Sequence, residues 1–119
     1  MTKGQIEAKI SEAISKFEIE QMGRGPERIR TIIIEDLIIV RLNGFLSKSE
    51  RSLAQNKEGI DLVKKVRIAL FENARESLEE AVKSVLEVNI ISTYSDVSTK
   101  TGEKIIGIVV DQNLENFYK

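Results

Sequence analysis

The sequence contains no histidine, no cysteine, no tryptophan and only one proline. Histidine and cysteine are the side chains most used to ligate zinc, haem and iron–sulfur clusters, and histidine is the usual proton-transfer group near neutral pH. We therefore expect no metal centre and no other cofactor. Disulfide bonds are impossible, which agrees with the reducing cytoplasm, and we expect the protein there.

Long apolar runs and an excess charge are also missing. No run approaches the roughly 18 apolar residues that span a bilayer, and residues 1–22 mix charged and apolar side chains, unlike a signal peptide. The 18 lysines and arginines nearly balance the 19 aspartates and glutamates, giving a net charge of −1. This balance argues against binding nucleic acid through its phosphates. We expect a protein that neither spans a membrane nor binds nucleic acid.

The 119 residues suit a single globular domain over 1–119. Hydrophobic spacing predicts helices and strands along its length. The expected helices cover residues 2–22, 47–55 and 58–87, and the expected strands cover 31–34, 37–42, 88–96 and 104–111. The apolar stripe of the long helix includes Val66 and Leu70. The order α-β-β-α-α-β-β predicts an α+β fold, in which helices pack on one antiparallel four-stranded sheet of two hairpins.

A turn at residues 35–36 would fix the register of the first hairpin. Arg30 then lies opposite Arg41, and like charges in facing positions are destabilising. We expect an acidic side chain or a bound anion between them. Asp96 or Glu103 could supply the acid; a phosphate, carboxylate or bicarbonate ligand is the alternative.

The glycine-rich segment 23–26 follows the first helix. Gly23, Gly25 and Pro26 are typical of a helix end, and this segment lacks the Lys-Ser/Thr of a phosphate-binding loop. Arginines are nevertheless concentrated around a loop whose backbone N–H groups could face an anion. The candidate residues for an anion or partner site are Arg24, Arg28, Arg30 and Arg41.

The first hairpin is apolar on both faces. Its register places Ile33, Ile38 and Val40 on one face and Ile32, Ile34, Leu37 and Ile39 on the other. Burying such a side chain contributes roughly 1.5–3 kcal/mol, so both faces should be covered. A helix of the same chain could cover the second face, or a second copy could do so in a homodimer.

No catalytic constellation is evident. The acidic pair at residues 35–36 suits a turn better than acid–base chemistry. Asp96 and Glu103 flank the second hairpin loop and could bind a hard cation such as Mg²⁺, although hydrogen bonds within the loop explain Asp96 better. We predict that the protein is not an enzyme and regard a metal-dependent enzyme as the least favoured alternative.

Several segments together resemble one protein family. They are Met-Gly-Arg-Gly-Pro at 22–26, Ile-Ile-Val-Arg-Leu-Asn-Gly-Phe-Leu at 38–46, Ser-Lys-Ser-Glu at 47–50 and Asp-Val-Ser-Thr-Lys-Thr-Gly-Glu at 96–103. This combination resembles the MpsC-like family of small bacterial proteins. Its motif positions without an assigned role are Gly23, Gly25, Pro26, Asp96, Gly102 and Glu103. Gly107 stands where that family would suggest a bulkier residue, which questions the packing of the last strand.

The resemblance implies association with a sodium-translocating system that generates membrane potential. We therefore expect a non-enzymatic cytoplasmic accessory or regulatory protein, with a membrane ion-transport protein as a partner. The alternative is a small-anion or metabolite-binding domain that uses the arginine cluster.

Overall fold

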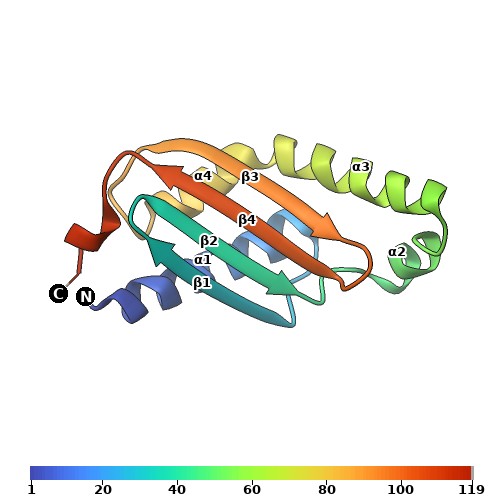
Figure 1. Cartoon of the computed structure of the whole chain (residues 1–119), viewed down its shortest axis with the longest axis horizontal. Coiled ribbons are helices and arrows are strands. Elements are labelled where there is room, and N and C mark those ends of the chain that lie inside the picture. Colours follow the sequence, from blue (N-terminus) through green and yellow to red (C-terminus); the bar gives the residue numbers. More distant parts are fainter. Residues whose placement is uncertain (119) are drawn as a thin grey trace.

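The computed structural model describes residues 1–118 and confirms an α+β fold (Figure 1). Its elements are α1 (Lys3–Met22), β1 (Arg28–Ile34), β2 (Leu37–Asn43), α2 (Lys48–Leu53), α3 (Lys57–Asn73), α4 (Arg75–Lys83), β3 (Ile90–Ser98), β4 (Glu103–Val110) and a short 3₁₀ turn at Leu114–Asn116. Lys119, the last residue of the domain expected over 1–119, lies outside the described residues.

The four strands form one antiparallel sheet in the order β1-β2-β4-β3. Both expected hairpins are present, and β2 and β4 join them in the centre. The turn at residues 35–36 is confirmed, with Glu35 in the left-handed region at φ 55°, and Arg30 lies opposite Arg41 as predicted. Gly107 faces Tyr94 across β4 and β3, and the strand pairing continues through it.

Local signals explain where the helices begin and end. The hydroxyl of Thr2 accepts a hydrogen bond from the Gln5 backbone N–H, and the Gln5 side-chain oxygen accepts one from the Thr2 backbone N–H, which forms the expected capping box of α1. Gly23 ends α1 at φ 81°, a conformation that glycine adopts without strain. The helix expected over 58–87 is present as α3 and α4, which divide at Ala74.

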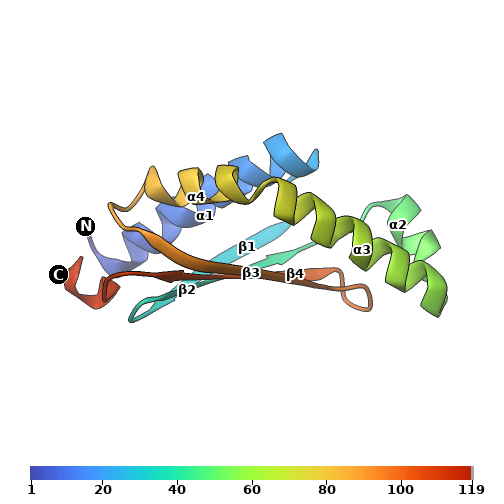
Figure 2. The same ribbon diagram turned by 90° about the horizontal axis from the view of Figure 1, so that it is seen from above.

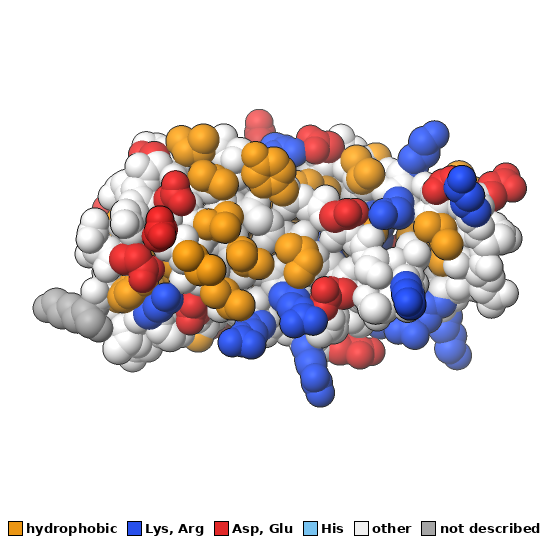
Figure 3. Space-filling view, viewed as in Figure 1, with side chains coloured by type: hydrophobic (Ala, Val, Ile, Leu, Met, Phe, Trp, Pro, Cys, Tyr) orange, Lys and Arg blue, Asp and Glu red, His pale blue; other side chains and the backbone are white. Residues whose placement is uncertain are grey.

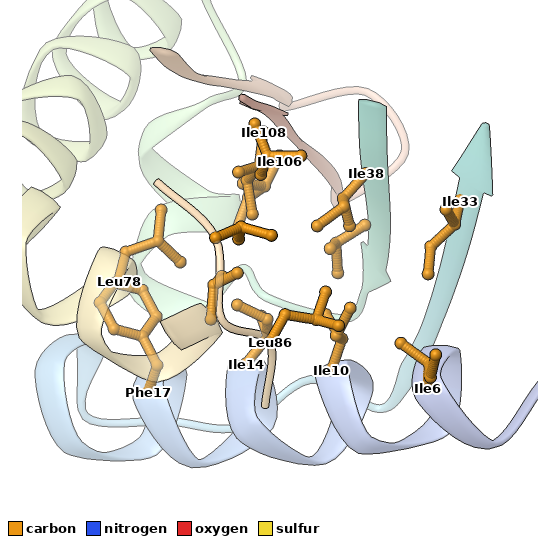
Figure 4. Packing of buried hydrophobic residues seen from close by; sticks show 14 of the residues in the cluster. Ile6, Ile10, Ile14, Phe17, Ile33, Ile38, Leu78, Leu86, Ile106 and Ile108 are labelled. Carbon is orange, nitrogen blue, oxygen red and sulfur yellow. The ribbon is translucent and has the colours of Figure 1, made fainter. Parts of the chain in front are cut away.

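All the helices lie on one side of the sheet (Figure 2). The helices α1 and α4 pack against its inner face, and this layer contains the main core (Figure 4). Ile10, Ile14, Ile33, Ile38 and Ile108 are fully buried there. Every second side chain of the strands points to the inner face, and the apolar side chains of α1 recur every three or four residues on the side of the helix that faces the sheet. These residues therefore share one core.

The helix α3 extends beyond the end of this layer together with α2 (Figures 1 and 2). Val66 and Leu70, expected in the buried stripe, are therefore 53% and 38% exposed. The arm formed by α2 and α3 has a small core of its own, made of Phe45, Leu46, Val63 and Val97.

Candidate functional site

The outer face of the sheet is the most distinctive surface, because no helix within residues 1–118 covers it (Figures 2 and 3). Strand pairing arranges its side chains in four rows that cross β1, β2, β4 and β3. The rows are Ile34-Leu37-Val109-Ser92, Ile32-Ile39-Gly107-Tyr94, Arg30-Arg41-Ile105-Asp96 and Arg28-Asn43-Glu103-Ser98.

The apolar part of this surface, hereafter the open apolar face, consists of Ile32, Ile34, Leu37, Ile39, Tyr94, Ile105 and Val109. Ile34, Tyr94 and Ile105 are 50%, 63% and 36% exposed, and the remaining members are half-buried. In the space-filling view, apolar side chains gather over the end of the sheet near the β1–β2 turn (Figure 3). A contiguous apolar surface of this kind typically marks a contact with another molecule.

The predicted arginine cluster assembles in part. Arg28, Arg30 and Arg41 lie on the outer face beside the open apolar face, in the last two rows. Arg24 is in the loop after α1, where its Nη1 donates a hydrogen bond to the Leu46 carbonyl oxygen at 2.9 Å. It therefore fastens that loop to the segment after β2.

Glu103 provides the acid expected beside the facing arginines. Its Oε2 lies 2.6 Å from Nε of Arg41, whose side chain is 57% exposed. Such an exposed ion pair typically contributes only about 0–1 kcal/mol. Asp96 does not take this place: its carboxylate accepts the Val97 backbone N–H at 2.8 Å and lies 3.7 Å from Nζ of Lys64.

Arg28 and Arg30 form no ion pair within the described part of the chain. At the opposite end of the same strands, the β1–β2 turn presents Glu35 and Asp36, both exposed and also without an ion pair among residues 1–118. The outer face is thus basic at one end, apolar in the middle and acidic at the turn.

Lys104 on the inner face was not among the predicted site residues. It is 2% exposed, and its Nζ donates to Oε1 of Glu18 at 2.8 Å. Burial lowers the pKa of Lys104, and nearby Arg67 acts in the same direction, whereas Glu18 opposes both. The signal was present in the sequence, because Lys104 shares the inward phase of Ile106 and Ile108 in β4.

A cavity of about 310 Å³ lies between α3 and β3, next to Lys104. Arg67, Phe71 and Arg75 line it from the helical side. The guanidinium of Arg67 donates to both carboxylate oxygens of Glu50, at 2.8 Å and 2.5 Å, and its carbon atom lies 4.9 Å from the centre of the Phe45 ring.

A family model described as "Na+-translocating membrane potential-generating system (MpsC)" matches residues 2–112. The chain belongs to the MpsC family. Two proteins of Bacillus subtilis (strain 168) are similar to it, and both are uncharacterized. YbcI is 33% identical over 114 residues, covering 96% of this chain and 92% of YbcI; YrhF is 26% identical over 108 residues, covering 90% and 88%. No solved structure matches this MpsC-family chain.

The glycines among the motif positions of this MpsC-family chain lie outside its strands, in the segments that join its elements, whereas Asp96 and Glu103 lie in β3 and β4. Gly102 has φ 73°, its N–H donates to the Ser98 carbonyl at 2.9 Å, and its own carbonyl accepts from the Gly44 N–H at 3.1 Å. The second hairpin loop is thereby attached to the end of β2. Gly25 approaches α1 so closely that a Cβ there would lie 3.0 Å from Ile19.

The possible metal pair of Asp96 and Glu103 does not form a compact carboxylate site. The two residues occupy different rows of the sheet, and each faces its own cation. Residues 1–118 contain no group of three or more Asp or Glu side chains placed to hold a metal ion. No helix among these residues is long and apolar enough to cross a membrane.

Proposed function

We propose that this MpsC-family protein is a non-enzymatic cytoplasmic accessory protein of a sodium-translocating system that generates membrane potential, and that it acts as a homodimer. The family description supports the link to that system. The open apolar face is the observation that carries the proposal, because it is a surface built for contact rather than for chemistry.

The composition of the open apolar face favours a protein occupant. Leaving a side chain such as Ile34, Leu37 or Ile105 in water forgoes part of the roughly 1.5–3 kcal/mol that its burial contributes. Several such residues together amount to an energy comparable with the net stability of a small domain, about 5–15 kcal/mol. A flat sheet face of this size is typically covered by a second sheet about 10 Å away.

Charge complementarity favours a second copy of this chain. Arg28 and Asp36 lie four positions on either side of Ile32 along the same hairpin. A two-fold axis that crosses the strands near Ile32 would stack β1 on β1 in opposite directions. Arg28 of each copy would then meet the acidic β1–β2 turn of the other, and the apolar rows would pack together. Such an interface is self-complementary, as two-fold symmetry requires.

In this arrangement the helical layers of the two copies face outward. The groove between α1 and α4 remains available to a further partner. We propose that a membrane protein of the sodium-translocating system docks on this groove, which makes the dimer a regulatory or assembly subunit.

A cellular measurement tests this function. Cells of the source bacterium that lack the gene should show a lower sodium-dependent membrane potential, measured with a potential-sensitive dye. The wild-type gene and the Leu62→Glu variant should both restore the membrane potential. Leu62→Glu introduces a charge on α3, where Leu62 is already 47% exposed and lies away from the sheet. Ile105→Glu, which breaks the open apolar face, should not restore the membrane potential. An unchanged potential in the deletion strain would contradict the proposal.

Anion binding is the second candidate function. The observation in its favour is that Arg28 and Arg30, on one face beside Arg41, form no ion pair among residues 1–118. A phosphate or carboxylate group could bridge these guanidinium groups. The homodimer accounts for Arg28 through the acidic turn of the second copy.

A further inference from the structure

We propose that the cavity between α3 and β3 binds a small monocarboxylate with an apolar body, through Lys104 and Arg67. The cavity lies at the β3 edge of the sheet, between β3 and α3, and Tyr94 is the one member of the open apolar face that lines it. The proposal rests on Lys104 and Arg67 and not on the homodimer or the sodium-translocating partner.

The polar end of the proposed site is a pair of cations with unused donors. A lysine ammonium has three N–H donors, and that of Lys104 donates only to Glu18 within the described chain. An arginine has five, and Arg67 uses Nε and Nη2, for Glu50 and the Phe45 carbonyl, which leaves Nη1. Both cations line the cavity, whereas Glu18 and Glu50 do not.

The lining of the cavity carries more cations than acids, namely Arg67, Arg75 and Lys104 against Glu72 and Asp96. The acids that pair with Lys104 and Arg67, which are Glu18 and Glu50, lie outside the lining. A buried ammonium with a single hydrogen bond is under-satisfied, and a carboxylate would supply further acceptors. The unpaired Oε2 of Glu18 shows that the buried pair makes only one hydrogen bond.

Part of the cavity wall is apolar. Ile68 and Phe71 of α3 face Val97 of β3, and the Phe71 ring centre lies 5.8 Å from Nζ of Lys104. An apolar body can pack against these side chains while its carboxylate reaches the cations. The volume of about 310 Å³ is at the small end of the roughly 300–1,000 Å³ typical of ligand sites.

Two acids that also line the cavity favour a ligand with a single negative charge. Glu72 and Asp96 also line the cavity, and they pair with Arg75 and Lys64. Their negative charge disfavours a dianion such as phosphate more than a monoanion. The guanidinium of Arg75 already donates hydrogen bonds to Glu72 and to Thr93, so Arg75 adds little to anion binding.

Benzoate and hexanoate are the probes, and their neutral amides, benzamide and hexanamide, are the controls. Backbone amide NMR titration of the full chain should show at least one carboxylate shifting the signals of Phe71, Val97 and Lys104. Its amide should bind about tenfold or more weakly, a difference of about 1.4 kcal/mol. Failure of both carboxylates at millimolar concentration, or equal affinity of acid and amide, would overturn the proposal.

Matched variants localise the binding. Ile68 and Val66 are 54% and 53% exposed on the same helix, but only Ile68 lines the cavity. Ile68→Trp should fill the mouth and weaken carboxylate binding about tenfold, whereas Val66→Trp should leave it within about twofold. Equal effects of the two variants would show that the carboxylate binds elsewhere.

A charge-removing variant completes the test. Glu18→Leu combined with Lys104→Met replaces the buried pair by apolar residues, a change that proteins often tolerate. The double variant should retain its fold by circular dichroism and lose the preference for carboxylate over amide. A folded double variant that keeps the preference would refute the role of Lys104.

Discussion

At the scale of single residues, the outer face contains an unresolved electrostatic conflict. Arg30 and Arg41 lie directly opposite each other, and only Arg41 has an acidic partner, Glu103. Cross-strand pairs of like charge are destabilising by a fraction of a kcal/mol. Whether that conflict is relieved by a ligand or by another protein chain separates the two candidate functions.

Phosphate distinguishes the alternatives. We expect phosphate to raise the melting temperature no more than chloride at matched ionic strength, because Glu103 already occupies Arg41. Arg30→Gln should change the melting temperature equally in both salts. The measurement is thermal unfolding monitored by circular dichroism, and the control variant is Lys16→Gln on the solvent-exposed side of α1. A phosphate-specific increase that disappears in Arg30→Gln but persists in Lys16→Gln would favour the anion site instead.

At the scale of elements, the arm formed by α2 and α3 depends on the contact between Glu50 and Arg67. Glu50 is the acid of the α2 capping box and also receives the Arg67 guanidinium. Burial raises the pKa of this carboxyl, but hydrogen bonds from Arg67 and from the Ser47 N–H outweigh it, and the net pKa is lowered. The interaction is thus strongest when Glu50 is charged.

Acid should therefore loosen this arm. A carboxyl whose folded-state pKa is lowered contributes stability above its unfolded pKa of about 4.3, and that contribution is lost as the pH falls through the folded value. Amide hydrogen exchange in α2 should accelerate below about pH 4 relative to α1. Glu50→Gln should already exchange faster at neutral pH and show a weaker acid response, whereas Glu58→Gln should behave as wild type. Equal acid responses in Glu50→Gln and wild type would contradict this account.

Local sequence patterns predicted the individual helices and strands better than the way in which they pack together. The alternation around the turn at 35–36 was enough to place Arg30 opposite Arg41. The pairing of β2 with β4 joins residues more than 60 positions apart, for example Arg41 and Ile105, and no local signal specifies it. The helix stripe suggested burial of Val66, which is exposed because α3 extends past the sheet.

The candidate site was predictable to the same extent. Register alone placed Arg30 opposite Arg41 and indicated an acid or a bound anion between them, but both Asp96 and Glu103 fitted until the strand pairs were known. Arg28, expected in the loop after the first helix, lies in β1. The cavity beside Lys104 required the packing of α3 on β3, a contact between distant segments. Site residues whose position depends on one hairpin could be predicted from the sequence, and those whose position depends on tertiary packing could not.

At the scale of the whole molecule, the helices give the sheet a covered face and an uncovered one. The inner face forms the main core with α1 and α4, while the outer face presents apolar rows between a basic end and an acidic turn. Two copies stacked in opposite directions would cover the apolar rows and bring Arg28 of each copy to the acidic turn of the other. The homodimer is therefore the central claim about how this MpsC-family chain works.

The molar mass in solution tests that claim most directly. Light scattering after size exclusion at micromolar concentration should give about twice the 13.4 kDa of one chain. Ile105→Glu should give a folded monomer, because a carboxylate at this position would lose its hydration when the interface forms, which costs several kcal/mol even with Arg41 opposite it. Leu62→Glu, at a position on α3 that is 47% exposed against 36% for Ile105, should remain dimeric. A wild-type mass of one chain, or an Ile105→Glu variant as dimeric as Leu62→Glu, would contradict the homodimer.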